Sequence, residues 1–174
     1  MFRESVSVHS ATSDGDATRV GSDNYFLANT HLAHDVQIGN RIIMSNLATL
    51  AGHVIVDDHA IIGGLAAVHQ FCRIGRYAMV GGCSKVVQDI APFMMADGNP
   101  AETRFVNKVG LERAGFGADT ISTLIKAYKT LFRSALTLDH ALSRLEADLA
   151  STPELKELNE LIQFVRASQR GLAR

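Results

Sequence analysis

Apolar residues return every six positions along the first half of the chain. Stepping by six gives twelve consecutive apolar residues: Val20, Phe26, Leu32, Ile38, Met44, Leu50, Val56, Ile62, Val68, Ile74, Val80 and Val86. The residue four positions further on is small or β-branched nearly throughout, as at Thr30, Ala48 and Ala60. A helix repeats at about 3.6 residues and a strand at about two, so neither explains a period of six. Fixed short periods of this kind are typical of a parallel β-helix.

The repeat also predicts which residues lie near one another. Three hexads, about 18 residues, close one triangular coil, and each hexad supplies a short strand and a tight corner. The apolar residue of each hexad points into the prism, and the small residue fits its crowded interior. Residues 18 apart therefore lie above one another on adjacent coils, roughly 4.8 Å apart. The period alone leaves the hand of the coil open, although parallel crossovers are normally right-handed.

The pattern becomes helical after Pro92 and a predicted turn at 97–100. One apolar stripe at helical spacing consists of Ile121, Leu124, Ile125, Tyr128, Leu131 and Phe132. A second runs from Leu138 to Leu149, and Thr152 followed by Pro153 predicts the start of a third helix. We therefore expect a mainly β chain with an α-helical C-terminus, comprising a parallel β-helix domain over 1–96 and a small helical domain over 97–174.

Charge and cysteine content narrow the functional classes. The chain has 17 basic and 18 acidic residues, so no strong field attracts nucleic acid or an anionic membrane. No apolar run approaches the roughly 18 residues of a membrane span, and the N-terminus has no signal-peptide pattern. Cys72 and Cys83 form neither a disulfide framework nor a CxxC motif, which fits a reducing compartment. These features predict a cytoplasmic protein with no integral membrane segment.

The repeat gathers polar residues at one corner of the predicted prism. Adding 18 to His34 gives Gly52, and adding 18 again gives Gln70. We therefore expect His34 beneath Gly52, with His53 beside that glycine and His69 one coil higher. Asp35 follows His34 directly; neighbours diverge on an extended chain, but at a corner their side chains can meet.

The polar residues at this corner are compatible with three hypotheses about their role. A solvated corner accepts any polar residue. Histidine is a common zinc ligand, and histidine-lined β-helix hydratases bind that metal. A histidine also has a pKa suited to acid–base chemistry, and an adjacent carboxylate can fix its tautomer and stabilise the imidazolium.

Several segments together resemble one known family. They are NTHLAHD at 29–35, LAGHV at 50–54, IIGG at 61–64, VHQFC at 68–72, MVGGCS at 79–84, GNPA at 98–101 and GLERAGF at 110–116. Their order and spacing resemble those of the acyl-carrier-protein-dependent UDP-N-acetylglucosamine O-acyltransferases, which begin lipid A synthesis. The resemblance spans nearly the whole chain. It implies a left-handed β-helix and a homotrimer with active sites in the clefts between subunits.

The resemblance also implies residue roles. His34 matches the general base that takes the proton from the 3-hydroxyl of the UDP-sugar as it attacks a β-hydroxyacyl thioester. Asp35 matches its supporting carboxylate, and Gly52 matches the glycine whose backbone N–H faces the developing oxyanion. Matches to substrate-binding positions are His31, His53, His69, Gln70, Gly82, Asn107 and Arg113. Gly82 matches the far end of the acyl groove, and Asn107 and Arg113 match residues near the nucleotide and its phosphates. No metal or other cofactor is expected, because acyl carrier protein delivers the acyl group.

Three departures from the family pattern affect what is expected. Family members have further coils before the position that matches Met1, and these carry part of the acceptor and acyl surface. Ala114 stands where the family has a second basic residue, and Phe105 stands where glycine is usual. Alternatives to the 3-hydroxyl transfer are transfer to a 3-amino UDP-sugar, an inactive trimeric scaffold, and a zinc hydratase.

Overall fold

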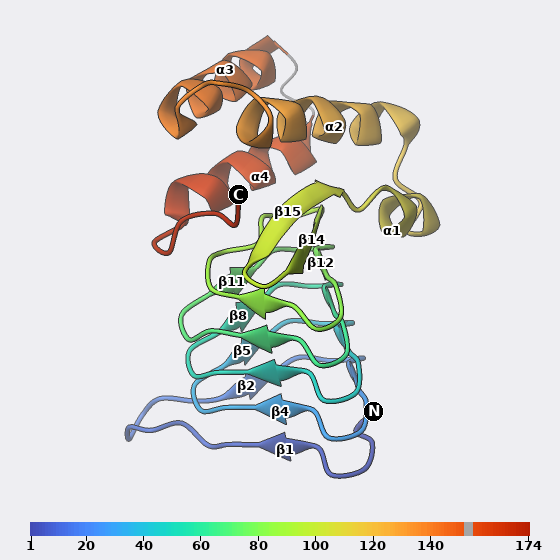
Figure 1. Ribbon diagram of the computed structural model, residues 1–174, viewed down its shortest axis with the longest axis vertical. Helices are drawn as coiled ribbons and strands as arrows, with labels where there is room; N and C mark the ends of the chain where they lie inside the picture. Colours follow the sequence, from blue (N-terminus) through green and yellow to red (C-terminus); the bar gives the residue numbers. More distant parts are fainter. Residues whose placement is uncertain (152–154) are drawn as a thin grey trace.

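The computed structural model describes residues 1–151 and 155–174. Its first half is a solenoid of two-residue strands separated by corners (Figure 1), as the six-residue period predicts. The strands are β1 Ser7–Val8, β2 Arg19–Val20, β3 Tyr25–Phe26, β4 His31–Leu32, β5 Gln37–Ile38, β6 Ile43–Met44, β7 Thr49–Leu50, β8 Ile55–Val56, β9 Ile61–Ile62, β10 Ala67–Val68, β11 Arg73–Ile74, β12 Met79–Val80 and β13 Lys85–Val86.

The strands stack in parallel into three sheets, which form the three faces of a prism, and the chain winds around it as a left-handed coil (Figure 1). The five-stranded sheet has the order β1-β4-β7-β10-β13, and the four-stranded sheet has the order β11-β8-β5-β2. The six-stranded sheet adds β14 Met94–Gly98 and β15 Ala101–Val106 to β12-β9-β6-β3. Residues 18 apart are paired, as at His31 and Thr49, which confirms the predicted coil length. Ser7 instead pairs with His31, because a longer loop between β1 and β2 enlarges that coil.

Inward-pointing side chains fill the prism. The predicted apolar positions from Phe26 to Val86 are buried, and Val20 at the open end packs against them while partly exposed. The small residues four positions later are buried as well, from Thr30 to Ser84. The corners use left-handed backbone conformations at non-glycine residues, including Asp35 at φ 61° and His53 at φ 59°. This conformation is unfavourable for most side chains, so the stacked coils must hold it at each corner.

The β14–β15 hairpin closes the prism and leads into the helices. The two strands are antiparallel and joined by the predicted turn. The helices are α1 Lys108–Arg113, α2 Ala118–Phe132, α3 Leu138–Ser151 and α4 Lys156–Ala167. Thr152 and Pro153, where the sequence predicts the start of the last helix, lie outside the described residues. The boundary predicted between 96 and 97 falls within β14, and the division into two domains stays a prediction.

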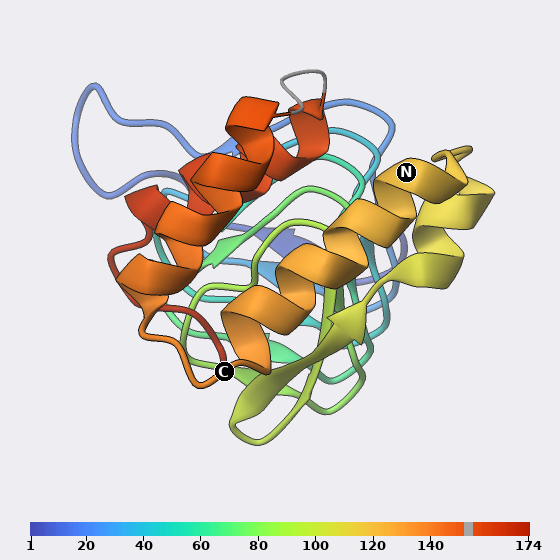
Figure 2. The same cartoon turned by 90° about the horizontal axis from the view of Figure 1, so that it is seen from above.

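The helices cover the end of the solenoid at which the chain leaves it (Figures 1 and 2). The predicted stripes of α2 and α3 form a second core with α4, the hairpin and the last coil. Arg76 at a solenoid corner donates to Glu160 of α4 through three hydrogen bonds of 2.7 to 3.0 Å. None of the helices in the described ranges has the length and apolar character needed to span a bilayer.

Candidate active site

The histidine cluster forms at the corner that joins the five-stranded and four-stranded sheets. His34 and Asp35 follow β4, and His53 lies one coil further on after β7. His34 Nδ1 is 2.8 Å from Asp35 Oδ2, and His53 Nε2 is 3.7 Å from the same oxygen. The two imidazoles meet edge to face with their centroids 5.2 Å apart. One carboxylate oxygen thus lies between two imidazole rings.

The contact between His34 and Asp35 depends on the corner. Side chains of consecutive residues in a strand point to opposite faces, whereas the positive φ of Asp35 turns the chain between them. The Asp35 side chain is nearly buried, with 7% of the residue exposed. The hydrogen bond with His34 is the main cause that lowers the pKa of this carboxyl. Burial acts in the opposite direction, and the hydrogen bonds from Thr12 offset part of that effect. Asp35 is therefore an anion at neutral pH.

The loop between β1 and β2 holds Asp35 from the other side. The Thr12 hydroxyl and backbone N–H donate to Asp35 Oδ2 over 2.8 and 3.3 Å. The Asp35 N–H donates to Thr18 Oγ1 over 2.8 Å. Neither threonine was predicted from the sequence, because both lie in a loop that interrupts the hexads and so have no place in the 18-residue stacking.

Gly52 lies against the His34 imidazole, as the 18-residue spacing predicts. A Cβ added at Gly52 would be 2.6 Å from His34 Nε2 and nearer still to Cε1. The glycine thus provides the space in which the ring lies. Within the described part of the chain, the Gly52 N–H donates no hydrogen bond, so it is free to bind an acceptor placed beside His34.

The next coil extends the cluster. His53 stacks on Phe71, with centroids 4.7 Å apart and ring planes 9° apart, and the Phe71 N–H donates to Gly52 O. Gln70 and His69 are exposed at this level, and His69 Nδ1 is 3.1 Å from the Gln70 carbonyl. The predicted column of His34, Gly52 and Gln70 is therefore present in the fold.

His31 lies on β4 rather than at the corner. Its Nδ1 is 2.8 Å from Ser7 Oγ, and its ring meets His9 edge on at 4.6 Å. Burial, followed by the charge of His9, lowers the pKa of the His31 imidazole. His31 thus faces outward from the five-stranded sheet, next to the corner cluster.

The other predicted binding residues lie along the six-stranded sheet. Asn107 accepts from the Gly110 N–H as the N-cap of α1 and donates to Tyr77 O. Asn107 and Arg113 line a largely apolar cavity of about 520 Å³ together with Ile61, Met79, Met95, Phe105, Val106, Lys108, Val109 and Gly110. Gly82 is exposed at the corner after β12, where an added Cβ would lie 3.3 Å from Gly64 O. Among the described residues, no hydrogen bond or ion pair joins this group to the His34 cluster.

Two residues that differ from the family pattern, Phe105 and Ala114, lie at or next to this cavity. The Phe105 ring forms part of the cavity wall and meets Tyr128 edge on at 5.2 Å. Ala114 is the C-cap residue of α1, directly after Arg113.

The His34, Asp35 and His53 side chains also offer a donor set that could hold a metal ion. Their ligand atoms lie within 4.8 Å of one another, and two histidines with a carboxylate suit zinc. Asp35 Oδ2, however, already accepts from Thr12 twice and from His34. A metal on this oxygen would have to displace these donors, so the geometry favours the hydrogen-bonded pair.

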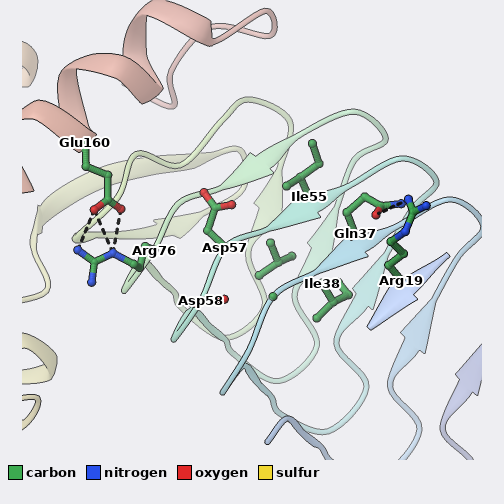
Figure 3. Close-up of a pocket in the computed structure, with 10 residues that line it drawn as sticks. Arg19, Gln37, Ile38, Ile55, Asp57, Asp58, Arg76 and Glu160 are labelled. Carbon is green, nitrogen blue, oxygen red and sulfur yellow. Dashed lines mark hydrogen bonds and ion pairs between the residues drawn. The ribbon is translucent and has the colours of Figure 1, made fainter. Parts of the chain in front are cut away.

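A further cavity lies on the four-stranded sheet, and none of its lining residues is a histidine. It measures about 610 Å³, and its lining includes Asp57, Asp58 and the Arg76–Glu160 pair (Figure 3). Burial raises the pKa of the Asp57 carboxyl, while the charge of Arg73 opposes this shift. A smaller cavity of about 280 Å³ reaches Asp35 and His53 and shares three lining residues with the larger one: Arg19, Gln37 and Ile55.

The chain is similar in sequence and in fold to known proteins. The model of a family described as UDP-N-acetylglucosamine O-acyltransferase, domain 2, matches residues 89–173. An acyl-[acyl-carrier-protein]–UDP-N-acetylglucosamine O-acyltransferase of Burkholderia orbicola is 45% identical over 175 residues, covering 99% of this chain and 67% of the relative. A protein of the same name from Anaeromyxobacter sp. strain K is 43% identical, covering 99% of this chain and 66% of the relative.

A solved structure of Arabidopsis UDP-N-acetylglucosamine acyltransferase has a TM-score of 0.94 and 36% identity, covering 99% of this chain and 62% of that one. The chain thus spans about two thirds of the length of the curated relatives it matches. The similarity in sequence and in fold to these proteins extends over 99% of the chain. It belongs to the family of acyl-[acyl-carrier-protein]–UDP-N-acetylglucosamine O-acyltransferases.

Proposed function

We propose that the chain transfers a β-hydroxyacyl group from acyl carrier protein to the 3-hydroxyl of UDP-N-acetylglucosamine, the first step of lipid A biosynthesis. The observation that carries the proposal is the His34–Asp35 hydrogen bond beside the free N–H of Gly52. The names of the relatives support the same reaction. An exposed free thiol at Cys83 supports a reducing, cytoplasmic location.

The geometry suits a base-assisted acyl transfer. Asp35 is ionised and only accepts, so His34 Nδ1 carries the proton in their hydrogen bond and Nε2 has a free lone pair. Nε2 takes the proton of the 3-hydroxyl while that oxygen attacks the thioester carbonyl. The tetrahedral oxyanion accepts from the Gly52 N–H, a type of donor worth about 10² to 10³ in kcat. When the carbon–sulfur bond breaks, His34 returns the proton to the thiolate of the carrier.

The rest of the site comes from a second copy of the chain in this proposal. Within one chain the His34 cluster and the Asn107–Arg113 cavity belong to different faces of the prism. Large apolar side chains on the six-stranded sheet and its corner to the five-stranded sheet are exposed: Tyr25, Ile43, Leu47 and Leu65. Apolar surface of this kind supports association, and a homotrimer would place the cavity of one subunit opposite the cluster of the next.

The experiment is an acyl-transfer assay with β-hydroxyacyl carrier protein and two acceptors, UDP-N-acetylglucosamine and its 3-amino analogue. We expect ester formation, and a loss of roughly 10² to 10⁴ in kcat for His34→Gln. The control is His140→Gln, on α3, which leaves the rate unchanged. Preference for the amino acceptor would contradict the hydroxyl assignment, and full activity of His34→Gln would contradict the base assignment.

A further inference from the structure

We propose that Thr12 is a positioning residue for the acid–base pair: its hydroxyl and amide fix the Asp35 carboxylate, which keeps the proton of neutral His34 on Nδ1. This inference rests on the proposed function and assigns a task to the loop between β1 and β2. Thr12 is 23 positions from Asp35 in sequence, yet both of its donors end on the Oδ2 atom that contacts His34.

Proton positions follow from the donors around this oxygen. A carboxylate accepts only, so the Thr12 hydroxyl, the Thr12 N–H and His34 Nδ1–H all donate to it. Three donors from different directions leave the carboxylate little freedom to rotate. Within the described residues, the only hydrogen bond of the His34 imidazole is the one to this oxygen, so the orientation of the carboxylate decides which ring nitrogen is protonated.

The loop is anchored at its far end as well. Thr18 Oγ1 accepts from the Asp35 N–H over 2.8 Å, and Gln37 Nε2 donates to Ala17 O over 2.7 Å. The loop therefore lies against both the backbone and the side chain of Asp35. The 24-residue pairing of Ser7 with His31 provides the extra chain that this requires.

A purely structural role is the competing explanation, in which Thr12 only ties down the loop. The two explanations differ in what happens to the His34 ring when the hydroxyl is removed but the loop remains folded. Thr12→Val removes the 2.8 Å hydrogen bond while keeping the side-chain shape and the amide donor. Thr12→Ser restores the hydroxyl.

The test is long-range ¹H–¹⁵N NMR of the chain with labelled histidines, in which the His34 signals are assigned by their loss in His34→Gln. We expect a single Nδ1–H tautomer in the unsubstituted protein and in Thr12→Ser, and a mixture of tautomers in Thr12→Val. In the transfer assay, Thr12→Val should lower kcat roughly ten- to hundredfold with KM unchanged, and Thr12→Ser should restore most of it. Thr130→Val on α2, where the hydroxyl donates to Lys126 O, is the matched control.

The NMR result separates this inference from the proposed function, because it needs no substrate. A tautomer mixture in Thr12→Val supports the positioning role even if no transfer is detected with either acceptor. A single Nδ1–H tautomer in a folded Thr12→Val protein overturns it. If Thr12→Val does not fold, Thr12→Ala, which also keeps the amide, is judged by the same signals.

Discussion

At the residue scale, the His34 imidazole lies where a side chain at position 52 would otherwise project. A Cβ on Gly52 would come within 2.6 Å of His34 Nε2, well inside van der Waals contact. The backbone of Gly52 does not have a positive φ, so an alanine there meets no conformational penalty of its own. The requirement for glycine comes from the ring alone.

Gly52→Ala should therefore displace His34 without unfolding the protein. We expect kcat to fall about a hundredfold, because a shift of about 1 Å at a reacting group is enough for such a loss, and Tm to stay close to that of the unsubstituted protein. The measurement is the transfer rate together with thermal unfolding. Gly117→Ala is the control, since a Cβ there has no neighbour within 4 Å. An unchanged kcat in Gly52→Ala would show that the ring is not needed where it lies.

Asp35 gives a second residue-scale prediction, in the pH dependence of stability. Its folded pKa is lowered, chiefly by the His34 hydrogen bond, below an unfolded value of about 3.9. The carboxylate therefore stabilises the fold above about pH 4, and this contribution is lost as pH falls through the folded pKa. The difference in unfolding free energy between the unsubstituted protein and Asp35→Asn should be largest at neutral pH and shrink in acid. Chemical denaturation between pH 3 and 7 measures it, and a difference independent of pH would contradict the assignment.

The residues that sequence alone located are those that obey the repeat. His34, Gly52 and Gln70 are separated by 18 residues, so stacking of the coils brings them together. The contact between Asp35 and His34 could be predicted because the two residues lie at a corner, where the side chains of neighbours can meet. Thr12 and Thr18 could not be located in this way, because their loop adds residues outside the period. The period also contains no information on binding residues away from the His34 corner, so Gly82, Asn107 and Arg113 were predicted from the family resemblance alone.

At the element scale, each hexad contributes one side chain to the core and one small residue beside it. Ile62 in β9 is fully buried between Met44 and Val80 of the neighbouring coils, whereas Ile55 in β8 points outward and is half-buried. The helical stripes were equally clear from sequence. The individual contacts between the helices and the solenoid were not, since Arg76 and Glu160, for example, are 84 positions apart.

Ile62→Ala should lower the free energy of unfolding by about 2 to 5 kcal/mol, the range for large-to-small changes in a core that cannot collapse. Ile55→Ala, the control from the preceding hexad, should cost about 1 kcal/mol or less, because its side chain stays partly in water. Denaturant titration followed by circular dichroism compares the two. Equal costs would mean that the solenoid interior relaxes around the missing atoms.

At the scale of the whole molecule, the two parts of the proposed site lie on different faces of one chain. The His34 cluster lies at the corner after β4, and the cavity with Arg113 lies along the six-stranded sheet that contains β9 and β12. A closed ring of three identical chains repeats one contact three times, so each cluster would face the cavity of the same neighbour. In such a ring the proposed trimer is a condition for activity as well as a feature of assembly.

Mixing two inactive variants tests that condition. His34→Gln removes the base, and Arg113→Ala removes the cation proposed to bind phosphate; each variant alone should have little activity. When the two are co-expressed with different tags and trimers carrying both are purified, each mixed trimer has both intact residues at about one of its three sites. We expect about that fraction of the original activity. If each site lay within one chain, every site would lack one residue and mixing would restore nothing, so the outcome separates a shared site from a self-contained one.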